Sequence, residues 1–203
     1  DAKWKETTIA NTSERQFTQE FECEFLGSVD TLITASKLRT LTYDDPLTTN
    51  GSLDVYENPI RDHDYIICVD VSRGLAQDYS AFVVIDITRA PWQLVAKYRD
   101  KDVRPMILPN IIYNVATNYN NAYVLTEVND IGEAVAGSLF YDVEYENVLM
   151  CAMKGRAGQQ VGQGFSGNKV QMGVKMSATV KAQGCSNLKT LIEDDKLLVK
   201  DYN

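Results

Sequence analysis

Two carboxylates stand at the ends of apolar segments, where a charge is costly unless something positive balances it. Asp70 follows the run YIICV and precedes a tight turn, and Glu127 follows AYVLT shortly before a predicted helix. Each pattern indicates a buried strand that ends in an acid. If these strands are neighbours in a sheet, the carboxylates approach each other, and a shared Mg²⁺ or Mn²⁺ would remove their repulsion. The structural alternative is that Asp70 caps its turn and Glu127 pairs with a surface lysine.

Other kinds of site have little support in the sequence. The chain has one histidine and four cysteines, which are widely spaced and include no CxxC pair. This pattern argues against zinc, and we expect reduced thiols in the core. No GxxxxGK[ST] phosphate loop occurs, and no apolar run is long enough to span a bilayer, so no membrane partner is expected. The first residues lack the pattern of a signal peptide, which favours a cytoplasmic location.

Basic residues are concentrated in one part of this acidic chain. The formal net charge of −8 argues against a protein that coats nucleic acid generally. Between residues 147 and 192, however, there is no Asp or Glu, and six Lys or Arg occur. This segment includes the glycine-rich stretch GRAGQQVGQGFSGNKVQMG, which predicts either a solvated loop or a basic arm that contacts backbone phosphates. Lys181 and Lys189 fall on a predicted helix and are expected to be solvated. The preferred phosphate contacts are Lys154, Arg156 and Lys169.

The remaining patterns predict the elements that position these residues. Residues 13–27 have Phe at a spacing of four and predict a short amphipathic helix, and residues 31–41 predict another turn or two. Residues 43–60 are polar and turn-rich, which indicates a linker. From residue 62 the pattern predicts the order β-β-β-α-β-α-β-α-β, in which an antiparallel meander comes first and Asn129 caps a later helix. This order implies an α/β fold with a mixed central sheet and helices on both faces.

Four segments carry a resemblance to a known family: FTQEFECEFLGS, ICVDVSRGLAQDYSAFVVIDI, LTEVNDIGEAVAGSLF, and the stretch from KVQMGVKMS to LKTLIEDDKLLVKDYN. In this order they resemble the nuclease half of the large terminase subunit, the DNA packaging protein of T-even-type tailed bacteriophages. The resemblance covers essentially the whole chain and implies a ribonuclease H-like (resolvase-type) fold. Residues 61–203 are then the nuclease domain, expected to lack its last helix, and residues 1–60 resemble the tail of the packaging motor and its linker.

The resemblance also implies which residues bind metal. The first-strand acid of the family matches Asp70 and the fourth-strand acid matches Glu127, both as ligands of Mg²⁺, with two ions expected. The chain departs from the family in two ways. Arg73 stands where relatives carry an acid, and the third acid of the family lies on a helix after the last strand. We therefore expect the third ligand beyond Asn203, and Asp201 is the nearest carboxylate within the chain.

The implied function is metal-dependent endonucleolytic cleavage of concatemeric double-stranded viral DNA during genome packaging, with Mn²⁺ able to replace Mg²⁺. The implied partners are double-stranded DNA, the portal protein, the small terminase subunit and the N-terminal ATPase motor domain of the full-length chain. The implied location is the host cytoplasm, at the portal vertex of the prohead. One alternative is a noncatalytic docking domain of the motor. Another is an ATP-binding kinase or actin-like protein, but DVSRG does not match the DxGxT turn that those proteins need.

Overall fold

The computed structural model describes Lys5, Thr7 and residues 31–74, 78–153, 159–162 and 170–201. The chain divides into two compact units, residues 1–41 and residues 42–203. In the first unit, helix α3 (Ala35–Thr40) confirms the helical turn expected there. The amphipathic helix predicted over residues 13–27 lies outside the described residues. Within the described part of the chain, no helix combines the length and the apolar character that crossing a bilayer would need.

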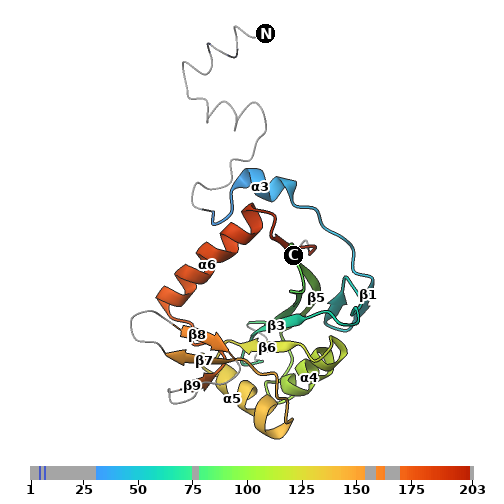
Figure 1. Cartoon of the computed structure of the whole chain (residues 1–203), viewed down its shortest axis with the longest axis vertical. Coiled ribbons are helices and arrows are strands. Elements are labelled where there is room, and N and C mark those ends of the chain that lie inside the picture. Colours follow the sequence, from blue (N-terminus) through green and yellow to red (C-terminus); the bar gives the residue numbers. More distant parts are fainter. Residues whose placement is uncertain are drawn as a thin grey trace. The chain divides into compact units, whose positions relative to one another are not determined.

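The second unit is built on a mixed central sheet (Figure 1). Its strands are β1 (Thr48–Asn50), β2 (Leu53–Val55), β3 (Tyr65–Asp70), β4 (Ser80–Asp86), β5 (Trp92–Asp100), β6 (Tyr123–Thr126) and β10 (Leu197–Leu198). Their order is β1-β2-β5-β4-β3-β6, and β10 pairs with β5 in parallel. Strands β3, β4 and β5 form the predicted antiparallel meander, and β6 runs parallel to β3.

A smaller sheet and several helices complete this unit. The strand order of the smaller sheet is β8-β7-β9. The remaining elements are α4 (Leu108–Asn118), α5 (Gly132–Gly137), a π-helical turn η1 (Ser138–Asp142), β7 (Met150–Met153), β8 (Gln159–Gly162), β9 (Val170–Met172) and α6 (Ala178–Glu193). Figure 1 shows α4 and α5 on one side of the central sheet and α6 toward the other.

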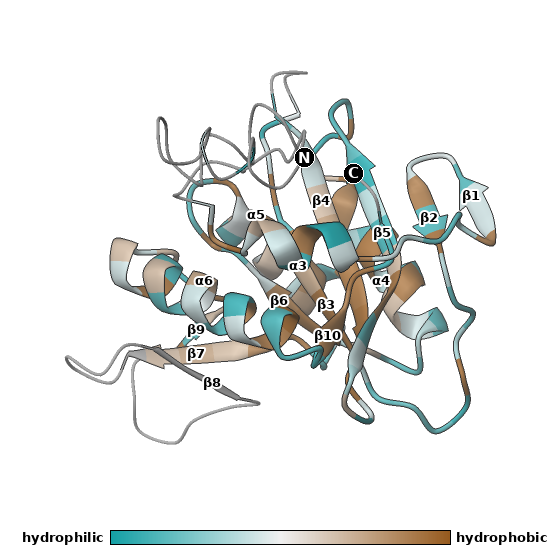
Figure 2. Cartoon of the chain, turned by 90° about the horizontal axis from the view of Figure 1, so that it is seen from above, coloured by the Kyte–Doolittle hydropathy of each residue, from teal (hydrophilic) through white to brown (hydrophobic). Residues whose placement is uncertain are grey.

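The main core lies between the central sheet and the helices α4 and α5. In β3, the side chains of Tyr65, Ile67 and Val69 point to this side and are at most 4% exposed. The intervening Ile66 and Cys68 are half-buried on the opposite face, which explains why the strand is apolar throughout. Figure 2 shows the hydrophobic residues gathered along these central strands. The strands are therefore rigid supports for whatever projects from their ends.

Part of the segment interpreted as a linker is instead a β-hairpin. Strands β1 and β2 pair with each other, and β2 pairs with β5, so this hairpin belongs to the central sheet. Gly51 has a φ of 60° in the turn between the two strands. The Asn50–Gly51 pair is a common hairpin signal, and the polar composition around it hid the strands. The assignment of residues 1–60 to the tail of a packaging motor stays a prediction.

The glycine-rich stretch is not one continuous loop. Strands β8 and β9 fall within it, and they pair with the two edges of β7 in antiparallel fashion. A neighbouring strand with free backbone groups can draw residues of low strand propensity into a ladder. The loop prediction for residues 155–173 is therefore wrong for these two strands. Residues 154–158 and 163–169 lie outside the described part of the chain.

Candidate functional site

Asp70 and Glu127 lie at the same end of two neighbouring parallel strands. Asp70 is the last residue of β3, and Glu127 directly follows β6. Val69 pairs with Thr126, and the amide of Glu127 donates a hydrogen bond to the carbonyl of Val69 at 2.9 Å. The next residues across the two strands are therefore the two acids. The condition set out from the sequence, that the strands ending in the two acids are neighbours in the sheet, is therefore met.

The two carboxylates line one pocket of about 380 Å³ on the face of the sheet opposite the main core. The other lining residues are apolar, among them Cys68, Leu125 and Met176. Burial raises the pKa of the Cys68 thiol to about 11, so this thiol is neutral at physiological pH. Apolar walls reduce the hydration of a charge and strengthen its interaction with other charges. The pocket therefore makes the two acids the dominant polar groups at the strand ends.

The electrostatics of the pocket suit a cation. Burial and the charge of Asp70 raise the pKa of Glu127 above its ordinary value, and the charge of Lys181 on α6 opposes this shift. No hydrogen bond or ion pair from the described residues reaches either carboxylate. Two carboxylates that share a pocket repel each other, and carboxylate oxygens are the ligands that Mg²⁺ and Mn²⁺ prefer. The two acids therefore fit a hard divalent cation.

The structural alternative for Asp70 is not supported. The turn after β3 is closed by serines: the Ser72 amide donates to Ser80 Oγ at 3.0 Å, and Ser72 Oγ donates to the carbonyl of Asp78 at 3.0 Å. Asp70 takes no part in these bonds. Its carboxylate is exposed at the pocket and remains available to a ligand.

Asp201 is engaged elsewhere in the fold. Its carboxylate accepts hydrogen bonds from Lys97 Nζ at 2.7 Å and from the Tyr56 hydroxyl at 2.8 Å. It is not among the residues that line the acidic pocket. Among the described residues, no group of three or more His, Cys, Asp or Glu is arranged to hold a metal ion. The third ligand expected beyond Asn203 stays a prediction.

Two glycines allow the backbone to pack closely around Glu127. A Cβ on Gly132, the first residue of α5, would lie 1.9 Å from the carbonyl oxygen of Glu127. A Cβ on Gly173 would lie 2.2 Å from the carbonyl oxygen of Thr126, and Gly173 also has a φ of 75°. The strand end that carries Glu127 is therefore enclosed by backbone on two sides. Neither glycine has a pattern in the sequence that marks it as part of the site.

Two side-chain links hold the loops beyond the acids. The prediction that Asn129 caps α5 is wrong. Its side-chain Nδ2 instead donates to the carbonyl of Met176, and its Oδ1 accepts from the backbone N–H of Met176, both at 2.9 Å. In the turn after Asp70, Arg73 forms a two-point contact with Asp130: Nε donates to Oδ2 at 2.6 Å and Nη2 donates to Oδ1 at 2.8 Å. The only sequence signal for this second link was the unexpected Arg73.

Comparison with known proteins places this geometry in a family. Residues 67–203 match the family described as the Terminase RNaseH-like domain, and both acids lie within the match. The chain belongs to this family. Membership and the mixed sheet together confirm the expected α/β, ribonuclease H-like fold.

Solved structures of phage terminases share the fold of this terminase RNase H-like domain. The large terminase nuclease of thermophilic phage G20c with bound magnesium is 22% identical, with a TM-score of 0.63 over 85% of this chain and 75% of that chain. The same nuclease with bound cobalt is 23% identical, with a TM-score of 0.62 over the same shares. The large terminase nuclease domain of Thermus phage P74-26 is 26% identical, with a TM-score of 0.55 over 81% of this chain and 70% of that chain.

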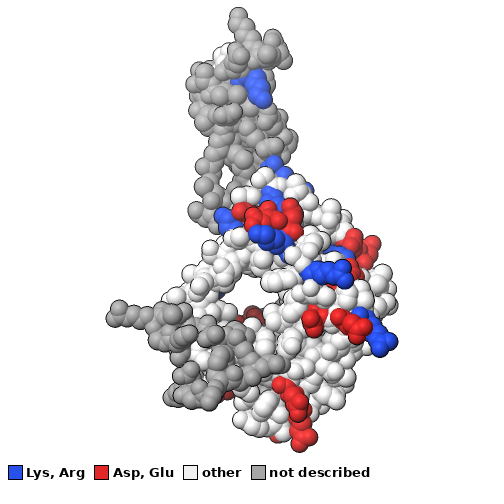
Figure 3. Space-filling view, viewed as in Figure 1, with Lys and Arg blue, Asp and Glu red and all other residues white. Residues whose placement is uncertain are grey.

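The predicted phosphate contacts Lys154, Arg156 and Lys169 lie outside the described residues of the terminase RNase H-like domain. Lys181 lies on α6, as expected, and its charge acts on Glu127. The structural alternative, in which Glu127 pairs with a surface lysine, is met only by this longer-range interaction, because no ion pair between Glu127 and a described lysine forms. On the face drawn in Figure 3, the described acidic and basic side chains are interspersed. Among the described residues of that face, no continuous basic surface stands out.

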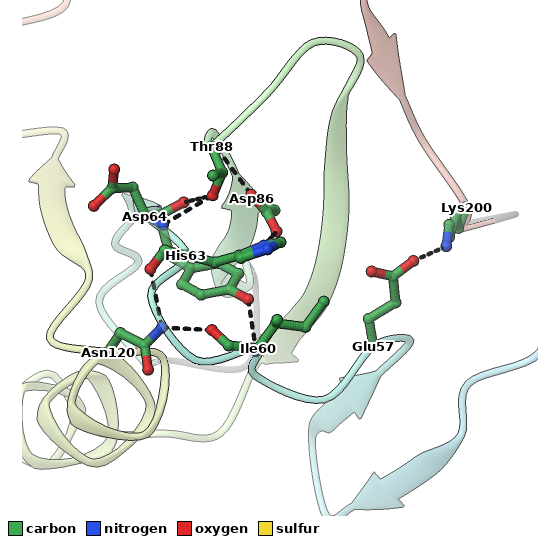
Figure 4. Close-up of polar contacts among 9 residues, drawn as sticks. Glu57, Ile60, His63, Asp64, Asp86, Thr88, Asn120 and Lys200 are labelled. Atoms are coloured by element: carbon green, nitrogen blue, oxygen red, sulfur yellow. Dashed lines mark hydrogen bonds and ion pairs between the residues drawn. The ribbon is translucent and has the colours of Figure 1, made fainter.

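The only histidine of the chain belongs to a different network, at the other end of β3 (Figure 4). His63 Nδ1 lies 2.6 Å from Asp86 Oδ2, and Asn120 donates to the carbonyls of Ile60 and His63. Burial favours the protonated form of Asp86, but its bonds with His63 and Thr88 outweigh this and lower its pKa. Strand geometry places His63 roughly 20 Å from the pocket end of β3. This network therefore fastens a turn and does not serve the acids.

The expected reduced thiols are confirmed for the described cysteines. Cys151 is buried, Cys68 and Cys185 are half-buried, and all three are free. Cys23 lies outside the described residues. The terminase RNase H-like domain therefore has no disulfide among its described cysteines.

Proposed function

We propose that this chain is the metal-dependent endonuclease domain of a viral packaging machine, which cuts concatemeric double-stranded DNA. The observation that carries the proposal is the convergence of Asp70 and Glu127 in one pocket, on a fold shared with large terminase nucleases. Structures of the G20c nuclease with bound magnesium, cobalt and zinc support the use of a divalent cation at these acids. We assign Mg²⁺ as the natural ion, with Mn²⁺ as a substitute and two ions in the site.

The residues of the pocket suit phosphodiester hydrolysis. Asp70, at the end of a buried strand, and Glu127 would hold the ions. Bound metal would supply an activated water and would stabilise the charge that develops on the phosphate. The packing of Gly132 against Glu127 fixes the backbone of one of these residues. No histidine base is needed in this scheme.

We further propose that DNA is held without base recognition through Lys154, Arg156 and Lys169, and that the chain is of the T-even type. The partners would be the portal protein, the small terminase subunit and the ATPase motor domain of the full-length chain, at the portal vertex of the prohead in the host cytoplasm. These assignments follow from the sequence resemblance and from the family.

The deciding experiment is plasmid cleavage by the full-length protein with Mg²⁺, with and without a chelator. Asp70→Asn should abolish cleavage and weaken Mn²⁺ binding while the protein remains folded. Asp62→Asn is the matched control, because the Asp62 side chain is 88% exposed and lies before β3 at the other end of the strand. Cleavage by Asp70→Asn at the wild-type rate would refute the assignment. A wild-type protein that does not cut DNA would instead favour a noncatalytic docking domain.

A further inference from the structure

A single side-chain contact joins the two loops that leave the acidic pocket. Arg73 is three residues beyond Asp70, and Asp130 is three residues beyond Glu127. The guanidinium of Arg73 donates two hydrogen bonds to the carboxylate of Asp130, at 2.6 and 2.8 Å. The contact therefore joins the loops that follow β3 and β6, three residues beyond the two acids.

Each loop is anchored independently of this contact. In the first loop, Gly74 has a φ of 67°, and a Cβ there would lie 2.6 Å from the carbonyl oxygen of Val103. In the second loop, Asn129 is fixed to the segment before α6 by two hydrogen bonds, and Asp130 has a φ of 54°. A guanidinium bound to a carboxylate at two points has little freedom in distance or angle. The contact therefore fixes the gap between two otherwise separate supports.

Fold stability does not explain the contact. The side chain of Arg73 is 67% exposed and that of Asp130 is 59% exposed. Ion pairs this exposed contribute little to stability. The contact is directional, however, and its two residues lie three positions beyond the two carboxylates that share the pocket. We therefore expect the contact to affect the positions of the two pocket carboxylates and not the stability of the fold.

We propose that the Arg73–Asp130 ion pair is a latch that sets the spacing of Asp70 and Glu127 so that both can bind the same cations. The inference rests on the proposed function, because it concerns the metal site of the nuclease. Arg73 and Asp130 are positioning residues, since they act through the backbone of their loops and touch neither acid.

Charge and positioning predict opposite results when Arg73 is replaced. Loss of the positive charge makes the surroundings of the pocket more negative, which by itself strengthens cation binding. Loss of the latch weakens cation binding, because the carboxylates are no longer held at the correct spacing. Arg73→Gln separates the two effects by the sign of the change in Mn²⁺ affinity.

The experiment is a calorimetric titration of Mn²⁺ into the full-length protein and three variants: Arg73→Gln, Asp130→Asn and the double variant. Asparagine tolerates the left-handed backbone conformation of residue 130. The double variant keeps the wild-type net charge but lacks the latch. The control is the double variant Arg61→Gln/Asp62→Asn, which removes an exposed ion pair of 3.7 Å before β3.

A latch predicts a loss of affinity of similar size in all three variants, of about tenfold or more, as is typical for groups that orient metal ligands. Their thermal midpoints should stay near that of the wild type, and the control should bind Mn²⁺ normally. A simple charge effect predicts tighter binding by Arg73→Gln, weaker binding by Asp130→Asn and wild-type binding by the double variant. That pattern, or unchanged binding in all three, would overturn the latch.

Two further arms keep the result decisive. Arg73→Lys keeps the charge but loses the two-point contact, so it should also weaken Mn²⁺ binding, and it tests the latch if Arg73→Gln folds poorly. Full affinity in Arg73→Lys would count against the latch. If the wild-type protein binds no Mn²⁺, or if Asp70→Asn binds it equally well, the proposed metal site fails. Wild-type binding with no effect of the variants refutes the latch alone.

Discussion

Replacing Gly132 by alanine should displace Glu127 and impair the site while the fold persists. Gly132 begins α5, and its Cα faces the backbone of Glu127. An added Cβ would lie 1.9 Å from the carbonyl oxygen of Glu127, although such contacts are essentially never shorter than 3.0 Å. The carbonyl oxygen must therefore recede by about 1 Å before van der Waals repulsion is relieved. The side chain belongs to the same residue and moves with this backbone.

A displacement of this size has a large effect on catalysis and a moderate one on stability. Misplacement of a reacting group by about 1 Å can cost on the order of 10²-fold in rate. Packing strain from an added methyl group typically lowers the free energy of unfolding by about 1–3 kcal/mol. Gly137, in the same helix, is the matched control, because a Cβ there has nothing within 4 Å. Gly137→Ala should raise the free energy of unfolding by about 0.5–1 kcal/mol.

The assay combines Mg²⁺-dependent plasmid cleavage, Mn²⁺ titration and thermal unfolding for both glycine variants. Gly132→Ala should lose both cleavage and Mn²⁺ affinity, whereas Gly137→Ala should retain both. A Gly132→Ala protein that cuts DNA at the wild-type rate would refute the reasoning. It would show that the start of α5 moves away without disturbing Glu127.

Glu127→Gln should stabilise the metal-free protein at pH 7, because burial and Asp70 raise the pKa of Glu127, so ionisation above that pKa costs stability in the folded state. This gain should disappear as the pH falls below the ordinary carboxyl value of 4.5, which thermal unfolding across pH will test. Gly184→Ala in α6, where an added Cβ meets open space, should raise the free energy of unfolding in urea by about 0.5–1 kcal/mol. The slope of log K for duplex binding against log salt, measured in Ca²⁺, should fall by roughly 0.9 for each phosphate contact removed. The residues replaced by alanine for that titration are Lys154, Arg156 and Lys169.

Two of these predictions have matched controls. Glu133→Gln makes the same chemical change as Glu127→Gln at an exposed position of α5, and an equal gain in stability there would contradict the role given to burial. The salt titration is compared with a triple alanine variant of exposed basic residues elsewhere, and an equal loss of slope would show that no local arm exists. The residues of that control are Arg61, Arg89 and Lys101.

The two acids could be predicted from the sequence because each one ends an apolar strand. Their proximity depended on a condition that the order of elements left open, namely that the two strands are neighbours in the sheet. The pairing of Val69 with Thr126 fulfils this condition. A buried strand with a charge at its end is a local pattern, and local patterns can be read from one sequence.

The links around the acids could not be predicted in the same way. Arg73 and Asp130 are 57 residues apart, and no periodicity connects them. Asn129 is of a residue type that often caps helices, but its side-chain amide forms a hydrogen bond with a residue 47 positions away. In these places long-range packing outweighs local preference, and a single sequence records only the local preference.

The pairing of β3 with β6 has a consequence for when the acids can work. Two further strands and α4 separate these strands along the chain, so their contact closes a long loop. Closing such a loop is entropically unfavourable and tends to slow folding. Before this step the two acids diffuse independently and cannot share a cation. A chain still emerging from the ribosome, or one partly unfolded, therefore carries both acids without the pocket they share, and any cleavage that needs both acids would begin only when this non-local contact has formed.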